Sequence, residues 1–229
     1  MVASAAARGC SVRLVMLGAP GVGKGTQGRR LAAVYGCQLI STGEILREAV
    51  ARGTPLGLEA RRQMDSGQLV DDDVMIGLVR ERTSEPDTRE GFVLDGFPRT
   101  VPQAEALDAM LAERGQRIEA VLHLAVSEDE LVRRLHGRRE CPVCKRAYNP
   151  EGAPAQDGLH CDDHRVVELR SRPDDSEAVV RHRFAEFRAK TAPLADYYTG
   201  TGRLRPVTGL GTMDEVFELA DHITVLRDG

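Results

Sequence analysis

The fold is decided by GAPGVGKGT at residues 18–26 and by the segments that flank it. Before it, residues 12–18 (VRLVMLG) form a short apolar run that ends in glycine, the pattern of a buried strand. After it, residues 24–35 carry Leu31, Ala32 and Tyr35 at helical spacing. A strand, a glycine-rich turn and a helix therefore follow one another without a gap.

Four more runs have the length and character of short strands: 38–40, 91–95, 120–126 and 203–207. Helical patterns lie between them. Among these are a helix that Asp71 could cap, a capping-box signature at Ser127 and Glu130, a helix at about 175–198, and a C-terminal helix from about Thr212. This alternation predicts an α/β, three-layer fold whose five-stranded parallel sheet is covered by helices on both faces.

Two stretches look like insertions on that core. Residues 41–70 are polar and mostly helical by pattern, whereas residues 137–175 are dominated by proline, glycine, cysteine and charge and have no periodicity. The predicted core is then residues 1–40, 71–136 and 176–229.

Composition narrows the class of protein. The chain has 229 residues, 41% of them hydrophobic, with no tryptophan and a formal net charge of −4. The hydrophobic content favours a globular protein. The negative net charge argues against a protein that coats nucleic acid and against one that binds anionic membranes. No apolar run approaches the roughly 18 residues of a membrane-spanning helix, and residues 1–10 look like an extension, not a secretory signal. We expect a cytoplasmic location.

The glycine-rich stretch fits the phosphate-binding pattern G-x-x-x-x-G-K in the strand-to-helix context that the pattern requires. Its glycines let backbone N–H groups converge, the helix adds its positive end, and Lys24 supplies an ammonium for the β- and γ-phosphates. Gly25 displaces the usual hydroxyl to Thr26, which shifts the expected Mg²⁺ anchoring toward Asp95 and water. A dinucleotide site is excluded because no acidic residue ends the strand at 38–40.

Asp95 ends the apolar run GFVLD, where a carboxylate can hold Mg²⁺ or its waters beside the phosphates. The alternative is a simple turn aspartate before Gly96. Arg99 follows three residues later and suits bidentate contact with a second phosphate group.

Arginines bracket the second insertion. Arg134 and Arg138 lie four apart on the helix begun at Ser127, and Arg172, Arg181 and Arg183 follow on the other side. Singly such arginines are usually solvated; together they suit a flap whose closure brings charge to the phosphates.

The insertion also carries Cys141-Pro-Val-Cys144 and Cys161-Asp-Asp-His164, a tetrahedral metal pattern that suits structural Zn²⁺. Asp163 is the rival for the fourth ligand, and His160 is interpreted as a bystander. A nucleic-acid-binding zinc finger is the competing interpretation, but the loop lacks the helix and basic surface of such a finger.

Four segments closely resemble adenylate kinase: 18–27 (GAPGVGKGTQ), 41–47 (STGEILR), 95–103 (DGFPRTVPQ) and 191–198 (TAPLADYY). The resemblance runs from about residue 12 to about residue 219. It implies Mg²⁺-dependent, reversible transfer of a phosphoryl group from ATP to AMP to give two ADP. It also implies a P-loop core with two mobile flaps, an NMP-binding insertion at 41–70 and a long zinc-containing lid at 137–175, in a protein that is usually monomeric.

The resemblance also assigns residues. Those implied for AMP are Thr42, Arg47, Gln68, Leu69, Val70, Gly96, Phe97, Pro98, Arg99, Gln103, Arg172 and Arg183. Those implied for ATP are Gly21, Val22, Gly23, Lys24, Gly25, Thr26, Arg138, Ala147, Tyr148 and Gly211. The catalytic set is Lys24, Asp95, Arg99, Arg134, Arg138, Arg172 and Arg183. Gln103 is implied to read the adenine edge, and Arg47 and Arg99 to hold the AMP phosphate.

Three alternatives remain at this point. A UMP/CMP kinase is disfavoured by Thr42, since the pyrimidine enzymes usually carry alanine there. A GTP:AMP phosphotransferase stays open because backbone contacts choose the donor base. The third is a zinc-finger-bearing nucleotide-binding module without turnover.

Overall fold

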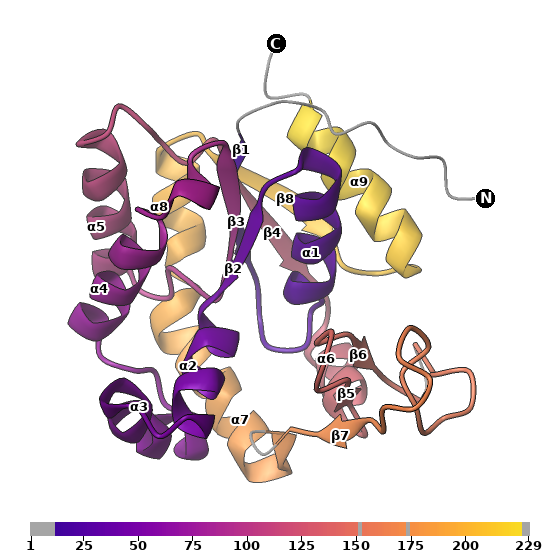
Figure 1. Cartoon of the computed structure of the whole chain (residues 1–229). Helices are drawn as coiled ribbons and strands as arrows, with labels where there is room; N and C mark the ends of the chain where they lie inside the picture. Colours follow the sequence, from indigo (N-terminus) through magenta and orange to yellow (C-terminus); the bar gives the residue numbers. More distant parts are fainter. Residues whose placement is uncertain (1–11, 151–152, 173–174, 226–229) are drawn as a thin grey trace.

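The computed structural model describes residues 12–150, 153–172 and 175–225 (Figure 1). The predicted N-terminal extension therefore lies outside the described residues. A five-stranded parallel sheet of order β2-β3-β1-β4-β8 forms the centre, as predicted. Its strands are β1 (Val12–Leu17), β2 (Gln38–Ser41), β3 (Gly91–Asp95), β4 (Ala120–Ala125) and β8 (Leu204–Thr208). β1 is central, because β3 and β4 pair on its two sides.

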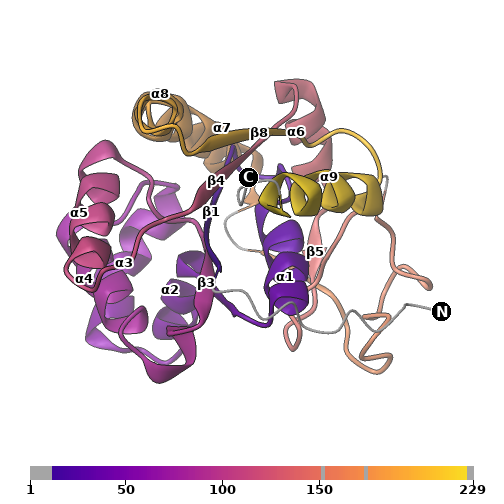
Figure 2. The ribbon, with the colours of Figure 1, turned by 90° about the horizontal axis from the view of Figure 1, so that it is seen from above.

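The helices form two layers, one on each face of the sheet (Figures 1 and 2). One layer holds α1 (Lys24–Tyr35), α6 (Glu128–Leu135), α7 (Glu177–Glu186) and α9 (Met213–Val225). The other holds α2 (Thr42–Ala51), α3 (Pro55–Ser66), α4 (Asp72–Arg82), α5 (Val101–Ala112) and α8 (Leu194–Gly200). A short 3₁₀ turn, Pro86–Thr88, precedes β3.

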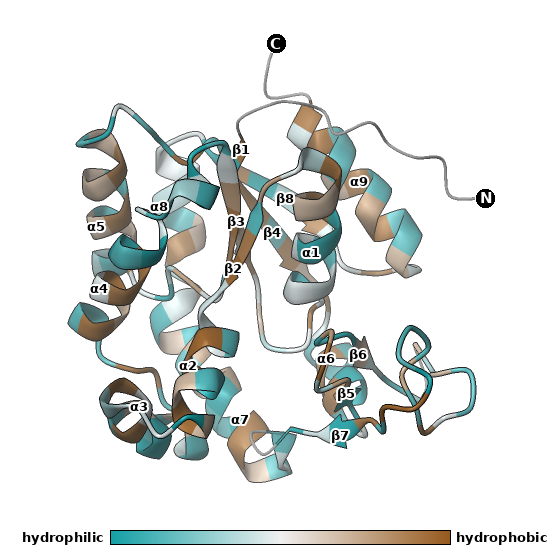
Figure 3. Ribbon diagram, in the orientation of Figure 1, coloured by the Kyte–Doolittle hydropathy of each residue, from teal (hydrophilic) through white to brown (hydrophobic). Residues whose placement is uncertain are grey.

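Each strand contributes side chains to the hydrophobic cores on both faces of the sheet, because successive side chains point to opposite faces. In β1, Leu14 and Met16 pack in the core with α1, whereas Val15 and Leu17 pack in the core with α4 and α5. All six residues of β1 are buried, and Figure 3 shows hydrophobic colours along much of β3, between helices of mixed character. This two-sided burial explains why the strand sequences are continuous apolar runs.

The first insertion contributes a pair of closely packed helices, α2 and α3. Thr54 caps α3 by accepting a hydrogen bond from the Gly57 backbone N at 3.1 Å, and Pro55 opens the helix. Gly57 then lies directly against the end of α2, so that a Cβ there would be 2.1 Å from the Ala49 carbonyl oxygen.

The second insertion forms a small antiparallel sheet of order β6-β5-β7. Its strands are β5 (Arg139–Glu140), β6 (Ala147–Tyr148) and β7 (Arg170–Ser171). Two-residue strands are too short to produce an alternating pattern, which explains why the sequence shows no periodicity here. A separate core holds this segment together, made of Cys141, Tyr148, Ala155, Cys161 and Leu169.

Three sequence predictions need correction in detail. The helix expected at 175–198 is divided into α7, a π-helical segment Phe187–Thr191 and α8, because Pro193 has no N–H for a continuous helix. The Ser127 hydroxyl caps α6 by accepting from the Glu130 backbone N at 3.4 Å, but the Glu130 side chain binds Arg134 instead of closing the box. Asp71 stands at the N-cap of α4 without a capping side-chain bond.

None of the described helices is both long and apolar enough to cross a membrane.

Candidate active site

The glycine-rich loop joins β1 to α1 and lies against two neighbouring elements. Gly18, Gly21 and Gly23 have φ values of 144°, 84° and 103°, in the region that favours glycine. A Cβ at Gly18 would lie 2.4 Å from the Leu124 carbonyl oxygen of β4, and one at Gly21 would lie 2.8 Å from Leu135 of α6. Glycine is therefore favoured at Gly18 and Gly21 for two reasons: φ is positive, and a side chain would collide with neighbouring atoms.

Lys24, the first residue of α1, folds back over this loop. Its Nζ donates to the carbonyl oxygens of Gly18 at 2.7 Å and Ala19 at 2.9 Å. Burial lowers the pKa of Lys24 to about 8. The Asp95 carboxylate acts in the opposite direction, while the charges of Arg99, Arg183 and Arg138 lower the pKa further.

Asp95 stands at the end of β3 and faces the start of α1, where a Cβ on Gly25 would be 3.1 Å from its Oδ2. The structure thus brings a carboxylate, the loop lysine and three predicted arginines into one electrostatic centre. Val22, Gly23, Gly25 and Thr26 occupy the loop and the first turn of α1.

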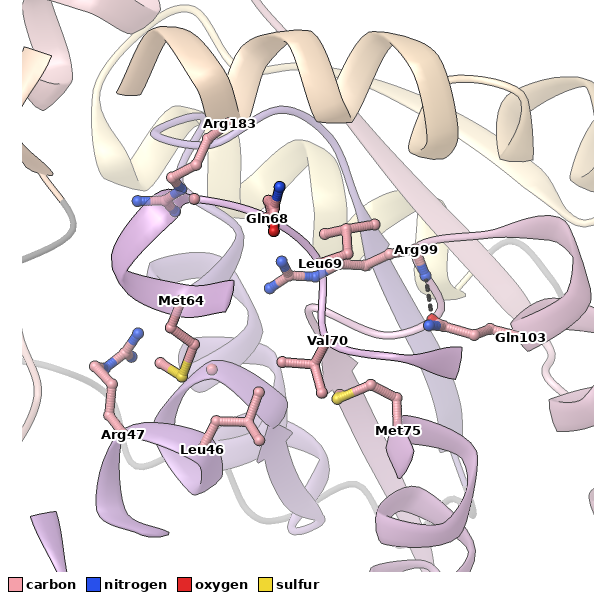
Figure 4. Close-up of a pocket in the computed structure, with 12 residues that line it drawn as sticks. Leu46, Arg47, Met64, Gln68, Leu69, Val70, Met75, Arg99, Gln103 and Arg183 are labelled. Atoms are coloured by element: carbon pink, nitrogen blue, oxygen red, sulfur yellow. Dashed lines mark hydrogen bonds between the residues drawn. The ribbon is translucent and has the colours of Figure 1, made fainter. Parts of the chain in front are cut away.

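A pocket opens beside this centre, between the helical insertion and the core (Figure 4). It is lined by Gly43, Leu46, Arg47, Met64, Gly67, Gln68, Leu69, Val70, Met75, Arg99, Gln103 and Arg183. Seven of these residues were predicted for AMP. The side chains of Arg47, Arg99 and Arg183 lie around an apolar floor that includes Leu46 and Val70, so the pocket combines anion-binding groups with a surface for a flat ring.

Other residues predicted for AMP are not among those that line this pocket. Phe97 and Pro98 are buried, and Phe97 packs in the hydrophobic core. Thr42 is fully buried and donates to the Asp95 carbonyl oxygen at 3.4 Å. A Cβ on Gly96 would be 2.8 Å from the Thr42 hydroxyl. Gly96 is linked to the pocket through its carbonyl oxygen, which accepts from Nε of the lining residue Arg99 at 2.8 Å.

The predicted lid arginines all have partners in this structure. Arg138 forms a two-pronged ion pair with Asp175, with Nε 2.7 Å from Oδ2, and Arg183 reaches the same carboxylate at 3.4 Å. Arg172 pairs with Glu140. Arg134 donates to Glu130 at 2.7 Å and to the Gly209 carbonyl oxygen at 2.9 Å.

Four further predicted residues belong to other elements of the structure. Arg181 pairs with Glu177, and its side chain is 77% exposed, so it does not join the group. Ala147 and Tyr148 form β6 of the lid, where Tyr148 is buried. Gly211 lies in the loop before α9, with a φ of 111°.

The lid brings together Cys141, Cys144, Cys161 and His164, whose ligand atoms all lie within 4.8 Å of one another. Individual separations are 3.6 Å for Cys144 Sγ to Cys161 Sγ, 3.6 Å for Cys161 Sγ to His164 Nδ1 and 4.0 Å for Cys141 Sγ to His164 Nδ1. A tetrahedral Zn²⁺ with bonds of 2.0–2.3 Å needs edges of about 3.5–3.8 Å. Two separations match these edges and the third is slightly longer, so the cluster has the ligand types and nearly the dimensions of a tetrahedral Zn²⁺ site.

The rival ligands have other partners. Asp163 pairs with Arg146 at 3.1 Å, and His160 Nδ1 is 2.7 Å from Asp157. Within the cluster, burial opposes ionisation of Cys161, but hydrogen bonds from Tyr148 and His164 and from backbone N–H groups lower the pKa of its thiol to about 6. A thiolate is the form that binds metal.

Sequence reasoning missed the acidic partners of the site: Asp72, Glu140 and Asp175. Asp72 was hidden in a run of three aspartates, and Glu140 pairs with an arginine 32 residues away. For Glu140 and Asp175 the only available signal was the excess of arginine around the lid, which predicts acidic partners without identifying them.

The site geometry agrees with the sequence comparisons. The family described as "Adenylate kinase" matches residues 16–203 of this chain. This chain belongs to the adenylate kinase family.

Similar adenylate kinases come from diverse organisms. The adenylate kinase of Thermodesulfovibrio yellowstonii is 51% identical over 206 residues, which cover 90% of this chain and 95% of that protein. That of Archaeoglobus fulgidus is 47% identical over 93% of this chain and 97% of its own. That of Nitrosococcus oceani is 45% identical over 93% and 96% respectively. The adenylate kinase match therefore spans the core and both insertions.

Proposed function

We propose that this adenylate kinase family member transfers a phosphoryl group reversibly from Mg²⁺-bound ATP to AMP, giving two ADP. The observation that carries this is the electrostatic interaction of Lys24, in the phosphate loop, with Asp95 and with Arg99 and Arg183, two arginines that line a separate pocket. Two anion sites that share one charged centre suit transfer between two nucleotides, whereas a simple hydrolase needs only one.

The donor ATP is assigned to the loop at Gly21–Thr26. Its backbone N–H groups and Lys24 would hold the phosphates. Arg138, Ala147 and Tyr148 are proposed to contact the nucleotide from the lid, and Gly211 from the loop before α9. Mg²⁺ neutralises phosphate charge and orients the phosphates when bound. Asp95 is the carboxylate placed to hold Mg²⁺ or its waters.

The acceptor AMP is assigned to the arginine-lined pocket. Arg47 and Arg99 would hold its phosphate, and the segment 68–70 with Gln103 would hold its base. No general base is required, because the acceptor is already a phosphate oxyanion. Positioning and neutralisation of charge by Arg134, Arg138, Arg172 and Arg183 then account for the catalysis.

The cluster of Cys141, Cys144, Cys161 and His164 is proposed to hold a structural Zn²⁺. All four positions are protein ligands, so the ion leaves no open site for chemistry. Its role would be to tie together a lid whose own core is small.

We further infer the division into a core (1–40, 71–136 and 176–229), an NMP-binding insertion (41–70) and a lid (137–175). The separate hydrophobic cluster of the lid supports its independence. The family resemblance favours a monomer. The free thiols of the described cysteines suit the reducing cytoplasm.

A single set of assays tests the function. Initial rates are measured with ATP or GTP as donor against AMP, UMP, CMP and GMP. We expect ATP with AMP to be the preferred pair, and Lys24→Ala to lose most turnover while its circular dichroism stays unchanged. Full activity on UMP with none on AMP would overturn the proposed acceptor, and near-normal turnover in Lys24→Ala would overturn the loop assignment.

A further inference from the structure

The side-chain amide of Gln103 is held in one of its two possible orientations. Gln103 lines the pocket but is only 1% exposed. Its Oε1 accepts from the Arg99 backbone N at 2.7 Å, as drawn in Figure 4, and its Nε2 donates to Asp72 Oδ1 at 2.7 Å. A backbone N–H can only donate and a carboxylate can only accept. Turning the amide over would therefore oppose donor to donor and acceptor to acceptor in a buried place.

Asp72 is itself fixed by the fold. Its second oxygen, Oδ2, accepts from the Thr100 hydroxyl at 2.8 Å. That hydroxyl also caps α5 by accepting from the Gln103 backbone N at 3.3 Å. The Asp72 carboxylate, at the start of α4, thus binds both the N-cap hydroxyl of α5 and the side-chain amide of Gln103. The orientation of this amide is therefore set before any ligand binds.

The amide has one N–H and one oxygen lone pair left for a ligand. A 6-aminopurine such as adenine presents an N–H donor on its amino group beside a ring-nitrogen acceptor. A 6-oxopurine presents the reverse order, a carbonyl acceptor beside a ring N–H donor. A fixed amide matches one order only, and a site built on buried polar groups rejects the mismatched base strongly.

We propose that Asp72 is a positioning residue that sets acceptor-base choice, holding Gln103 in the orientation that accepts a 6-aminopurine nucleotide and rejects a 6-oxopurine nucleotide. This inference rests on the proposed function, in which the pocket takes AMP. Asp72 acts through Gln103 without touching the nucleotide itself.

The test is Asp72→Asn, compared with the unaltered chain on AMP and inosine monophosphate. The asparagine amide keeps the shape but can donate as well as accept. It therefore removes one of the two groups that fix the Gln103 amide and leaves only the Arg99 backbone N–H to favour the original orientation. We expect the KM for AMP to rise about tenfold, the equivalent of one hydrogen bond. The AMP-to-inosine-monophosphate ratio of kcat/KM should fall by about the same factor, while the KM for ATP and kcat change by less than about twofold.

The matched control is Asp73→Asn, which makes the same charge change one residue along α4 at an exposed position. It should leave both KM values and the base ratio unchanged. Thr100→Val is the second variant, because it removes the hydroxyl that fixes Asp72 Oδ2; it should shift the base ratio in the same direction by a smaller factor. This variant decides the matter if Asp72→Asn does not fold.

The outcomes separate this inference from the proposed function. An unaltered chain that fails to phosphorylate AMP would overturn the function. An unaltered chain that prefers AMP, with a folded Asp72→Asn variant that keeps the same KM for AMP and the same base ratio, would overturn the role of Asp72 alone. Equal shifts in the Asp73→Asn control would also overturn it.

Discussion

The lowered pKa of Lys24 predicts that capture of ATP weakens in mildly alkaline solution. Burial, with the charges of Arg99, Arg183 and Arg138, brings this pKa from 10.5 to about 8 in the ligand-free protein. Only the protonated ammonium attracts phosphate, and kcat/KM reports the ionisation of the free enzyme. We therefore expect kcat/KM for ATP to be constant well below pH 8 and to fall as the pH rises through 8.

The magnitude follows from simple titration. With a pKa of about 8, kcat/KM for ATP should fall about thirtyfold between pH 7 and pH 9.5. The second ionisation of a phosphate group lies near pH 6, so the nucleotides contribute little in this window. Bound phosphate favours the charged lysine and raises its pKa again. We therefore expect kcat at saturating ATP to stay flat over the same range.

The assay is an initial-rate measurement at saturating AMP and constant ionic strength, with quenched samples resolved by ion-exchange chromatography so that no coupling enzyme is exposed to alkali. Lys24→Arg is the control, because a guanidinium keeps its charge throughout this range. Its kcat/KM should be lower but independent of pH. A flat profile for the unaltered chain, or an equally steep fall in Lys24→Arg, would refute the reasoning.

Two further predictions concern the insertions. Cys141→Ser should lose stoichiometric zinc, and hydrogen exchange of the lid amides should accelerate by more than about tenfold while the amides of the central sheet keep their protection; full zinc content would show the ligand set to be wrong. Gly57→Ala should destabilise by more than about 2 kcal/mol in chemical denaturation, because its Cβ would lie 2.1 Å from the Ala49 oxygen. Gly53→Ala, which has a φ of +65° but open space around it, should cost only about 1 kcal/mol, and equal losses would contradict the steric argument.

The sequence was sufficient for the strands because each is a buried run with a clear end. Residues 91–95 are apolar up to Asp95, and the structure places β3 over the same residues. The lid strands could not be found in this way, since each has two residues and pairs with partners distant in sequence. Pro193 is a residue type that breaks helices, and it lies between α7 and α8. Because the sequence pattern is helical both before and after Pro193, it predicted one continuous helix.

In the candidate site, too, local patterns could be predicted from the sequence, whereas contacts between distant residues could not. The glycine-rich loop, the arginines and the metal cluster are local patterns, and local patterns survive in a linear sequence. Their counter-charges are not local: Asp175 faces Arg138 across 37 residues. Asp72 is distinguished from Asp71 and Asp73 only by the helical phase at the start of α4, which a run of three identical residues conceals.

The carboxylates of Asp175 and Glu140 already occupy the guanidinium groups that the phosphates are proposed to use. Nucleotide binding at these positions is then an exchange of one anion for another, and not the filling of a bare cationic surface. Salt weakens the outgoing ion pair as well as the incoming one, so the two effects partly cancel. The affinity of this site for nucleotide should therefore be less sensitive to ionic strength than its number of arginines suggests. We expect a small anion such as inorganic phosphate, which lacks the contacts of a whole nucleotide, to displace the internal carboxylates less readily than a nucleotide does.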